Sequence, residues 1–465
     1  MKHDPANVKI VLGETDRGPL ALPLSMTREK QWAVFGSVGQ RKSLFLASLL
    51  LQFLRLPQDV VVMIDLGGDQ AVFWLLREAA QAAGKPFYFL SLDETHDSCS
   101  WDPIHGCPAY RDDPMLASAG VAQGLSLIHG EGPRKYWSRQ NQSTVDEAFD
   151  NLRLAGLKLP SFAELAGELK RMGKDSGSAQ YVSEAYLAAE PLLRFSALTK
   201  RHAVQLDLAR AFEEGAVVYG YLPTARRSEA SRAVASLLAY SVMVQAAHRT
   251  NLGLEPRYGH LGVEEYAQIC APKTNLDASL TLARKWGLHH YFVLQDASQL
   301  KTQDGDLGPI IRSQCQRVIF SCESEDEIDE LRNRSLDVPQ PHLSTSLRGL
   351  GASTSLREEL EPGLTRNEIM QRSGVALDAY AVLKLGDKHR DPIPFRVIPP
   401  TASPEEHAKL KNRPLPQKPR RSAPCSAGDV GADDAHGAAA DFRAALLDLE
   451  ARIAAESAWE LPKNA

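Results

Sequence analysis

A glycine-containing loop that ends in Lys-Ser is the first place in this chain where residue types and spacing predict chemistry. The segment Gly36-Ser-Val-Gly-Gln-Arg-Lys-Ser43 matches G-x-x-x-x-G-K-[ST] at every fixed position except Arg41. In such a loop, backbone N–H groups and the positive end of the following helix hold phosphate oxygens. Gly36, Gly39 and Arg41 would line the phosphates. Lys42 would reach the β- and γ-phosphates, and the Ser43 hydroxyl would bind Mg²⁺. An ordinary strand-to-helix turn is the alternative.

Arg41 stands where the motif has its second glycine. A Cβ there crowds a backbone that must approach the phosphates closely, and a positive φ would be costly. A guanidinium also pairs well with phosphate oxygens, so we expect nucleotide binding to be weakened and not abolished. If the side chain turns outward, the loop stays open. If it folds inward, it fills the γ-phosphate position and pairs with Asp65, Glu264 or Glu265.

Two adjacent acids follow an apolar run and supply the carboxylates that magnesium–nucleotide chemistry requires. The run 258–263 is followed by Glu264, which would hold the metal, and by Glu265, which would polarise the attacking water. Gln295 follows another run, 290–294, and a side-chain amide there can orient that water. The alternatives are that the two acids begin a solvated helix and that Gln295 is only a loop residue.

Apolar, β-branched runs alternate with helical patterns and predict an α/β fold with a mainly parallel sheet. The run 60–64, Val-Val-Val-Met-Ile, does not alternate with polar residues, which indicates a strand buried on both faces. It is followed by Asp65, and ligands of such folds bind at the carboxyl ends of the strands, so Asp65 is a further candidate for nucleotide binding. Other strands are predicted at 87–92, 216–221, 258–263, 290–294 and 317–320, and helices at 71–83, 228–248 and 277–286.

The same patterns divide the chain into four parts. Residues 1–107 and 202–400 carry the strand signals, whereas 108–201 has helical spacing without β-branched runs. We therefore expect an all-helical lobe inserted between two strands. Residues 401–465 are rich in Pro, Ser, Ala and Gly, which predicts a disordered tail, and apolar residues at 4-3-4 spacing in 442–453 predict one short helix within it.

Composition excludes several classes of protein. The 465 residues carry a net charge of −5, so no overall basic field indicates nucleic acid. The six cysteines form no C-x-x-C pair, and no stretch approaches the roughly 18 apolar residues of a membrane-spanning helix, so we expect a soluble protein.

A basic run at 409–421 would contact DNA phosphates or anionic lipid, or serve only as a linker. His289 and His290 are adjacent, which predicts one core and one surface histidine, not a metal site.

Several short motifs, in their order along the chain, resemble those of the type IV secretion coupling proteins, the TraD/TrwB/TraG-like DNA-transfer ATPases. The phosphate loop falls on the Walker A loop of that family. Residues 63–69 resemble its "D-x-K-G-D" strand end, with Gly67 in place of the lysine, and residues 264–268 are similar to its "D-E-F-A-Q" Walker B segment. Residues 283–299 resemble its "R-K-x-G … x-x-Q-S-x-x-Q" run. The similarity covers roughly residues 8–400.

The resemblance implies a RecA-like P-loop NTPase domain with an inserted helical lobe, assembled as a hexamer and using ATP and Mg²⁺ to move DNA. It implies catalytic roles for Lys42, Glu265 and Gln295 and metal binding by Ser43 and Glu264. The implied partners are single-stranded DNA or a relaxase–DNA complex, and secretion-channel or membrane-anchoring proteins. The implied location is the cytoplasm, peripheral at the inner membrane.

Three departures from the family pattern leave two functions open. Arg41 replaces a glycine, Gly67 replaces a lysine and Glu264 replaces an aspartate, and the N-terminal membrane helices of the family are absent from the sequence. The first function is a motor that moves DNA or delivers a nucleoprotein to a secretion or conjugation channel. The second is a catalytically degenerate RecA-like scaffold that recruits partner proteins without hydrolysing ATP.

Overall fold

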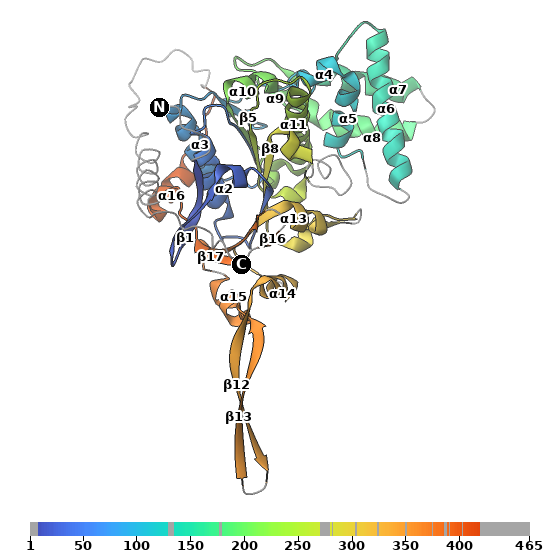
Figure 1. Cartoon of the computed structure of the whole chain (residues 1–465). Coiled ribbons are helices and arrows are strands. Elements are labelled where there is room, and N and C mark those ends of the chain that lie inside the picture. Colours follow the sequence, from blue (N-terminus) through green and yellow to red (C-terminus); the bar gives the residue numbers. More distant parts are fainter. Residues whose placement is uncertain are drawn as a thin grey trace.

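The structure is a computed structural model that describes residues 8–128, 134–175, 179–269, 280, 282–302, 305–322, 325–348, 351–373, 375–385, 388–389, 391–401 and 403–418. An eleven-stranded, mainly parallel sheet organises these residues and confirms the predicted α/β fold (Figure 1). The strands lie in the order β2 (Gly18–Pro23), β1 (Lys9–Thr15), β17 (Ile393–Arg396), β14 (Asp378–Val382), β11 (Cys315–Ile319), β3 (Gln31–Phe35), β8 (Leu288–Leu294), β7 (Gly259–Val263), β4 (Val60–Asp65), β6 (Val217–Tyr221) and β5 (Phe87–Ser91).

The seven strands from β11 to β5 are parallel to one another, and the other four pair in antiparallel fashion at one end of the sheet. The run predicted at 60–64 is β4, whose six residues are all buried between β7 and β6. It therefore lies in the interior of the sheet, as its continuous apolar sequence requires.

Two hydrophobic cores cover the two faces of this sheet because successive side chains of each strand point to opposite sides. Val61 and Met63 pack in the core that contains the apolar residues of α2 (Lys42–Phe53) and α3 (Gln70–Ala82). Val62 and Ile64 pack in the core that contains those of α11 (Thr224–Asn251). Short helices complete the connections: α1 (Leu24–Thr27), α10 (Leu208–Glu214), α13 (Gly308–Gln314), and the 3₁₀ turns η3 (Tyr266–Gln268), η4 (Ala283–Trp286) and η5 (Ala297–Leu300).

Between β5 and α10, the described residues of 108–201 form helices and no strand. They are α4 (Ala109–Asp112), α5 (Pro114–Gly124), α6 (Arg134–Leu154), α7 (Phe162–Asp175), α8 (Ala179–Ala189), η2 (Glu190–Arg194) and α9 (Ser196–Thr199). In Figure 1, α9 lies beside α10, whereas α4 to α8 gather at the upper right of the molecule. Their apolar residues are continuous with the core on the α11 face of the sheet. The division of the chain into domains stays a prediction.

A long antiparallel hairpin that was not predicted from the sequence lies between α14 (Glu325–Arg334) and α15 (Arg366–Arg372). Its strands, β12 (Asp337–Arg348) and β13 (Gly351–Pro362), pair from Asp337↔Pro362 to Arg348↔Gly351 and project away from the sheet, at the bottom of Figure 1. The strands carry Ser, Thr and Pro and no continuous apolar run, which explains why strand signals were missed. Two-residue strands form two further pairs, β9 (Lys301–Thr302) with β10 (Gly305–Asp306) and β15 (Lys384–Leu385) with β16 (Lys388–His389).

Two expectations from the sequence were wrong in the described residues. The predicted disordered tail begins with α16 (Pro404–Asn412), which buries Leu410 against the face of the sheet that carries α3, and Arg413, which follows α16, pairs with Glu78 of α3. His289 and His290 are both buried, since both faces of β8 are covered. The predicted helix at 442–453 lies outside the described residues, as do 277–279 and 281 of the helix predicted at 277–286, whose last four residues form the 3₁₀ turn η4. No described helix has the length and apolar content needed to cross a membrane.

Candidate nucleotide-binding site

The strand order brings the predicted site residues to one edge of the sheet. β3, β8, β7 and β4 are consecutive parallel neighbours. Their carboxyl ends are therefore adjacent, and they lead into Gly36, Gln295 and Glu264, while Asp65 is the last residue of β4. This is the edge where open α/β sheets bind ligands.

The loop after β3 is held by the neighbouring strand ends. The Gly36 N–H donates to the Gln295 carbonyl oxygen over 3.2 Å. The Ser37 N–H donates to Ser321 Oγ, which follows β11, over 2.8 Å, and the two hydroxyls lie 2.7 Å apart. A Cβ on Gly36 would lie 2.8 Å from the Phe320 Cβ, and Gly39 has a φ of 90°. Both glycines are therefore required by the loop conformation.

Arg41 occupies the left-handed backbone region that the sequence analysis identified as costly. Its φ is 62° and its ψ is 32°, and it is the N-cap of α2 without a side-chain capping bond. In the described part of the chain, the N–H groups of Gly39, Arg41 and Ser43 donate to no protein acceptor. Unpaired N–H groups at the start of a helix are suited to an anion, as the motif predicts.

The Arg41 side chain does not fold onto the acids. Among the described residues it forms no ion pair with Asp65, Glu264 or Glu265. Its charge instead acts on His407 of α16, whose pKa is lowered by burial, raised by Asp69 and lowered by Arg41. The ion pair that the inward alternative requires is therefore not formed among the described residues.

Lys42 is buried and directs its ammonium into the loop. Its Nζ donates to the carbonyl oxygens of Gly36 and Ser37, the latter over 2.9 Å. These two carbonyls precede the loop residues that would surround the phosphates. The lysine is therefore placed inside the loop that it would bridge to a nucleotide.

Asp65 and Glu264 form a buried carboxylate pair beside Ser43. Asp65 accepts the Gly68 N–H over 2.6 Å and the Tyr219 hydroxyl over 2.9 Å. Burial, and then the charge of Asp69, raise the pKa of Asp65 to about 6, although the hydrogen bond from Gly68 lowers it. Burial and the charge of Asp65 raise the pKa of Glu264 well above its usual value, while a hydrogen bond to Ser43 lowers it. Two carboxylates this close disfavour double ionisation.

These residues fit a Mg²⁺ ion, which prefers oxygen ligands and is bound in such sites through one or two carboxylates and the phosphates of the substrate. Glu264 Oε1 is buried without a hydrogen-bond partner, and the Ser43 hydroxyl is next to the same carboxylate. A Cβ on Gly67 would lie 3.1 Å from Glu264 Oε2 and 3.7 Å from Asp65 Oδ1. The position where the family has lysine therefore faces the pair, and glycine leaves the pair without that cation.

Glu265 and Gln295 meet at the same edge. Gln295 Nε2 donates to both carboxylate oxygens of Glu265, over 3.0 and 3.1 Å. Glu265 has a φ of 52° and a ψ of 44°, a conformation that side-chain-bearing residues rarely adopt and that clusters at functional sites. The predicted meeting of the phosphate loop with the acidic strand end, more than 200 residues away, is confirmed. The roles assigned to these residues stay predictions.

Sequence reasoning missed three residues of this region. Ser321 holds the phosphate loop, Tyr219 holds Asp65, and His407 lies near Arg41 and Asp69. Ser321 follows a strand end, like Gln295, and the tyrosine hydroxyl of β6 is a polar group within an apolar run, so both had a weak signal. His407 had none, because its segment has the composition of a tail.

Comparisons with known proteins agree with this geometry at the level of the fold. No protein-family model matches the chain, and no curated protein matches it in sequence. The unbound, monoclinic form of the bacterial conjugative coupling protein TrwBdeltaN70 matches with a TM-score of 0.55 and 19% identity, over 83% of this chain and 89% of that one. TrwB in complex with ADP and Mg²⁺ matches with a TM-score of 0.56 and 18% identity, over the same shares. The chain shares the TrwB fold.

The chain is also similar in structure to a second protein. VirB4 of Thermoanaerobacter pseudethanolicus matches with a TM-score of 0.54 and 12% identity, over 86% of this chain and 98% of that one. The motif resemblance to coupling proteins is thus confirmed as a likeness of fold, and the RecA-like P-loop architecture with it.

Proposed function

We propose that the chain is an ATP-driven motor of the coupling-protein type, which moves DNA or delivers a nucleoprotein substrate to a type IV secretion or conjugation channel. The observation that carries this proposal is the convergence of the Ser43 hydroxyl, the Asp65–Glu264 pair and the Glu265–Gln295 pair beside a loop with unpaired N–H groups. The TrwB that shares this fold has been seen in complex with ADP and Mg²⁺.

The proposed chemistry assigns one task to each residue. Lys42 and the loop N–H groups bind the β- and γ-phosphates, and Ser43 with Glu264 holds Mg²⁺, which supplies charge neutralisation of the phosphates when bound. Glu265 accepts the proton of the attacking water, and Gln295 orients that carboxylate through its amide. We further propose that the motor acts as a homo-hexamer, in the cytoplasm at the inner membrane, with DNA and channel proteins as partners.

A second function has its own support. Arg41 lies in the left-handed region, Lys42 is held by loop carbonyls, and Gly67 leaves the acidic pair without a lysine. These features favour a RecA-like scaffold that binds nucleotide weakly and recruits partners without turnover.

Titration calorimetry with ATP and Mg²⁺, followed by a phosphate-release assay with and without single-stranded DNA, tests the proposal. The unmodified chain should bind and hydrolyse ATP. Lys42→Ala should weaken binding about a hundredfold, because about 3 kcal/mol of charge-assisted hydrogen bonding to phosphate is lost. Lys9→Ala, at an exposed lysine of β1, is the matched control and should change nothing. Binding without release of phosphate would favour the scaffold, and equal binding by both variants would exclude a nucleotide site at this loop.

A further inference from the structure

A cavity of about 400 Å³, lined by charged and amide-bearing residues together with Leu280, lies at the edge of the sheet opposite the candidate nucleotide site. Its lining residues precede three neighbouring strands: Lys30 and Gln31 at the start of β3, Arg284 and Lys285 before β8, and Gln314 before β11. The carboxyl ends of the same three strands lead into Gly36, Gln295 and Ser321 of the nucleotide site. Because β3 has five residues, about 17 Å separates the two edges.

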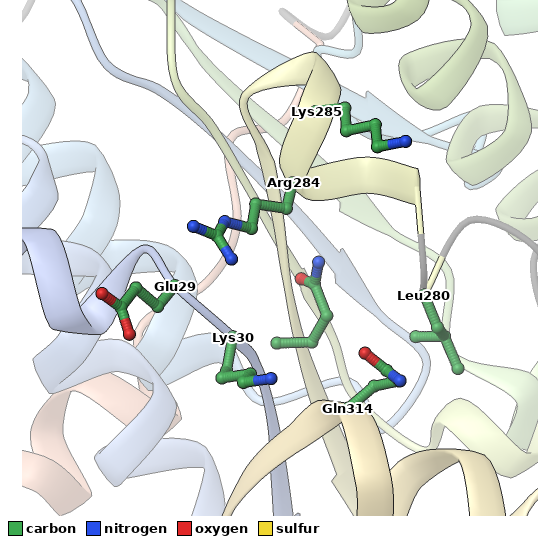
Figure 2. A pocket seen from close by; sticks show the side chains of 7 residues that line it. Glu29, Lys30, Leu280, Arg284, Lys285 and Gln314 are labelled. Atoms are coloured by element: carbon green, nitrogen blue, oxygen red, sulfur yellow. The ribbon is translucent and has the colours of Figure 1, made fainter. Parts of the chain in front are cut away.

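The charges around this cavity are unbalanced. Three cations, Lys30, Arg284 and Lys285, line it together with a single carboxylate, Glu29 (Figure 2). In the described part of the chain none of the three cations forms an ion pair, whereas Arg317, which follows the cavity residue Gln314 along the chain, pairs with Glu330. Like charges held around one cavity repel each other, and an anionic ligand relieves that repulsion.

The polar groups of the cavity match a phosphate group. Arginine and lysine are the side chains that bind phosphate oxygens, the first as a planar fork and the second as a point charge. Gln31 is buried, and its Oε1 accepts the His290 N–H over 2.6 Å, so its amide nitrogen is the group left to donate to a ligand. Arg284 and Lys285 are exposed at the rim, where a ligand larger than the cavity can also reach them.

We propose that this cavity is a second phosphate-binding site, independent of the P-loop, in which Lys30, Arg284 and Lys285 bind a polyanionic phosphate ligand. The phosphates come either from the backbone of a single-stranded nucleic acid or from a free polyphosphate. Binding at this site does not require nucleotide hydrolysis. The proposal can therefore be correct or wrong independently of the proposed motor function.

The test uses the Lys42→Ala chain, in which binding at the P-loop site is expected to be about a hundredfold weaker. Fluorescence anisotropy measures the affinity of this chain for labelled dT20, and calorimetry measures its affinity for tripolyphosphate. Replacing Lys30, Arg284 and Lys285 by Gln should weaken binding of at least one probe tenfold or more. With dT20, the slope of log K against log[salt] should fall by about 2, since each lost phosphate contact removes about 0.7.

A matched variant controls for net charge. Lys9, Arg17 and Lys158 are exposed cations away from the cavity, and replacing all three by Gln removes the same charge. This control should bind both probes as the Lys42→Ala chain does. Glu29→Gln removes the one acid of the cavity and should tighten binding about twofold to fivefold.

The outcomes separate the two ligand sources. Loss of dT20 binding alone assigns the site to a nucleic-acid backbone, and loss of tripolyphosphate binding assigns it to a free polyphosphate. The proposal is overturned if the cavity variant and the charge-matched control bind equally, or if the Lys42→Ala chain binds neither probe at low salt. Neither result bears on ATP binding by the unmodified chain.

Discussion

The amide nitrogen of Gln295 lies 3.0 and 3.1 Å from the two carboxylate oxygens of Glu265. Gln295 follows β8 and Glu265 follows β7, and these two strands are neighbours in the sheet. The amide therefore fixes the orientation of a carboxylate whose own backbone is in the left-handed region. Such a pair is suited to positioning and deprotonating a water molecule.

We predict that Glu265→Gln keeps ATP binding and loses hydrolysis. A glutamine retains the shape of the side chain but cannot accept the proton, so turnover should fall about a hundredfold to ten-thousandfold. Gln295→Ala should lower turnover by about a hundredfold, because the carboxylate is no longer oriented. Phosphate release and calorimetry measure both effects, with Gln58→Ala at an exposed glutamine as the control. Unchanged turnover in Glu265→Gln would remove Glu265 from the mechanism.

We predict that Arg41→Gly changes ATP affinity less than tenfold. The side chain makes no ion pair with the acids among the described residues, so its removal opens no blocked position. Arg41→Ala keeps a Cβ in the left-handed region and should be about 1 kcal/mol less stable to urea than Arg41→Gly. An increase in affinity of a hundredfold or more in Arg41→Gly would show that the guanidinium fills the phosphate site.

We predict that the nucleotide-free protein loses stability as the pH rises through about 6. The folded pKa of Asp65 is raised from 3.8 to about 6, chiefly by burial and next by Asp69, and that of Glu264 is raised as well. The folded state therefore holds these protons more tightly than the unfolded chain does. The contribution of the protonated carboxyl groups to the free energy of unfolding is fully present below pH 4. It is lost when these groups ionise, and for Asp65 the loss is about 2 to 3 kcal/mol.

Urea denaturation at pH 4 and pH 8, with and without millimolar Mg²⁺, measures this dependence. Mg²⁺ should restore stability at pH 8, because a cation offsets the two buried charges. Glu264→Gln should reduce both the pH dependence and the Mg²⁺ effect, whereas Glu255→Gln at an exposed site should alter neither. A Mg²⁺ effect of the same size in Glu264→Gln would contradict metal binding by Glu264.

We predict that the segment 403–418 is an integral part of the folded protein. Arg413 Nη1 lies 2.5 Å from Glu78 Oε1, and its guanidinium lies 3.6 Å from the Trp74 ring centroid. Arg413→Ala should lower the free energy of unfolding by about 1 to 2 kcal/mol, because a half-buried ion pair and a cation–π contact are lost. Lys409→Ala, at an exposed residue of α16, is the control. Equal stability of the two variants would show that the segment contributes nothing.

The sequence alone determined the parts of this protein that are encoded within a few residues. The apolar run of β4 predicted a strand buried on both faces, and the phosphate loop with Lys42 and Ser43 predicted the start of α2. Both depend on local periodicity and on a short motif, which are visible along the chain. The motif order also predicted the fold that TrwB shares.

Only the tertiary structure decided how these parts meet. β7 lies between β8 and β4, and this order places Glu264 against Asp65 and Ser43 and raises the pKa of both acids through burial. The same covering of both sheet faces buries both His289 and His290. Strand neighbours and burial are set by residues hundreds of positions away, so no local pattern contains them.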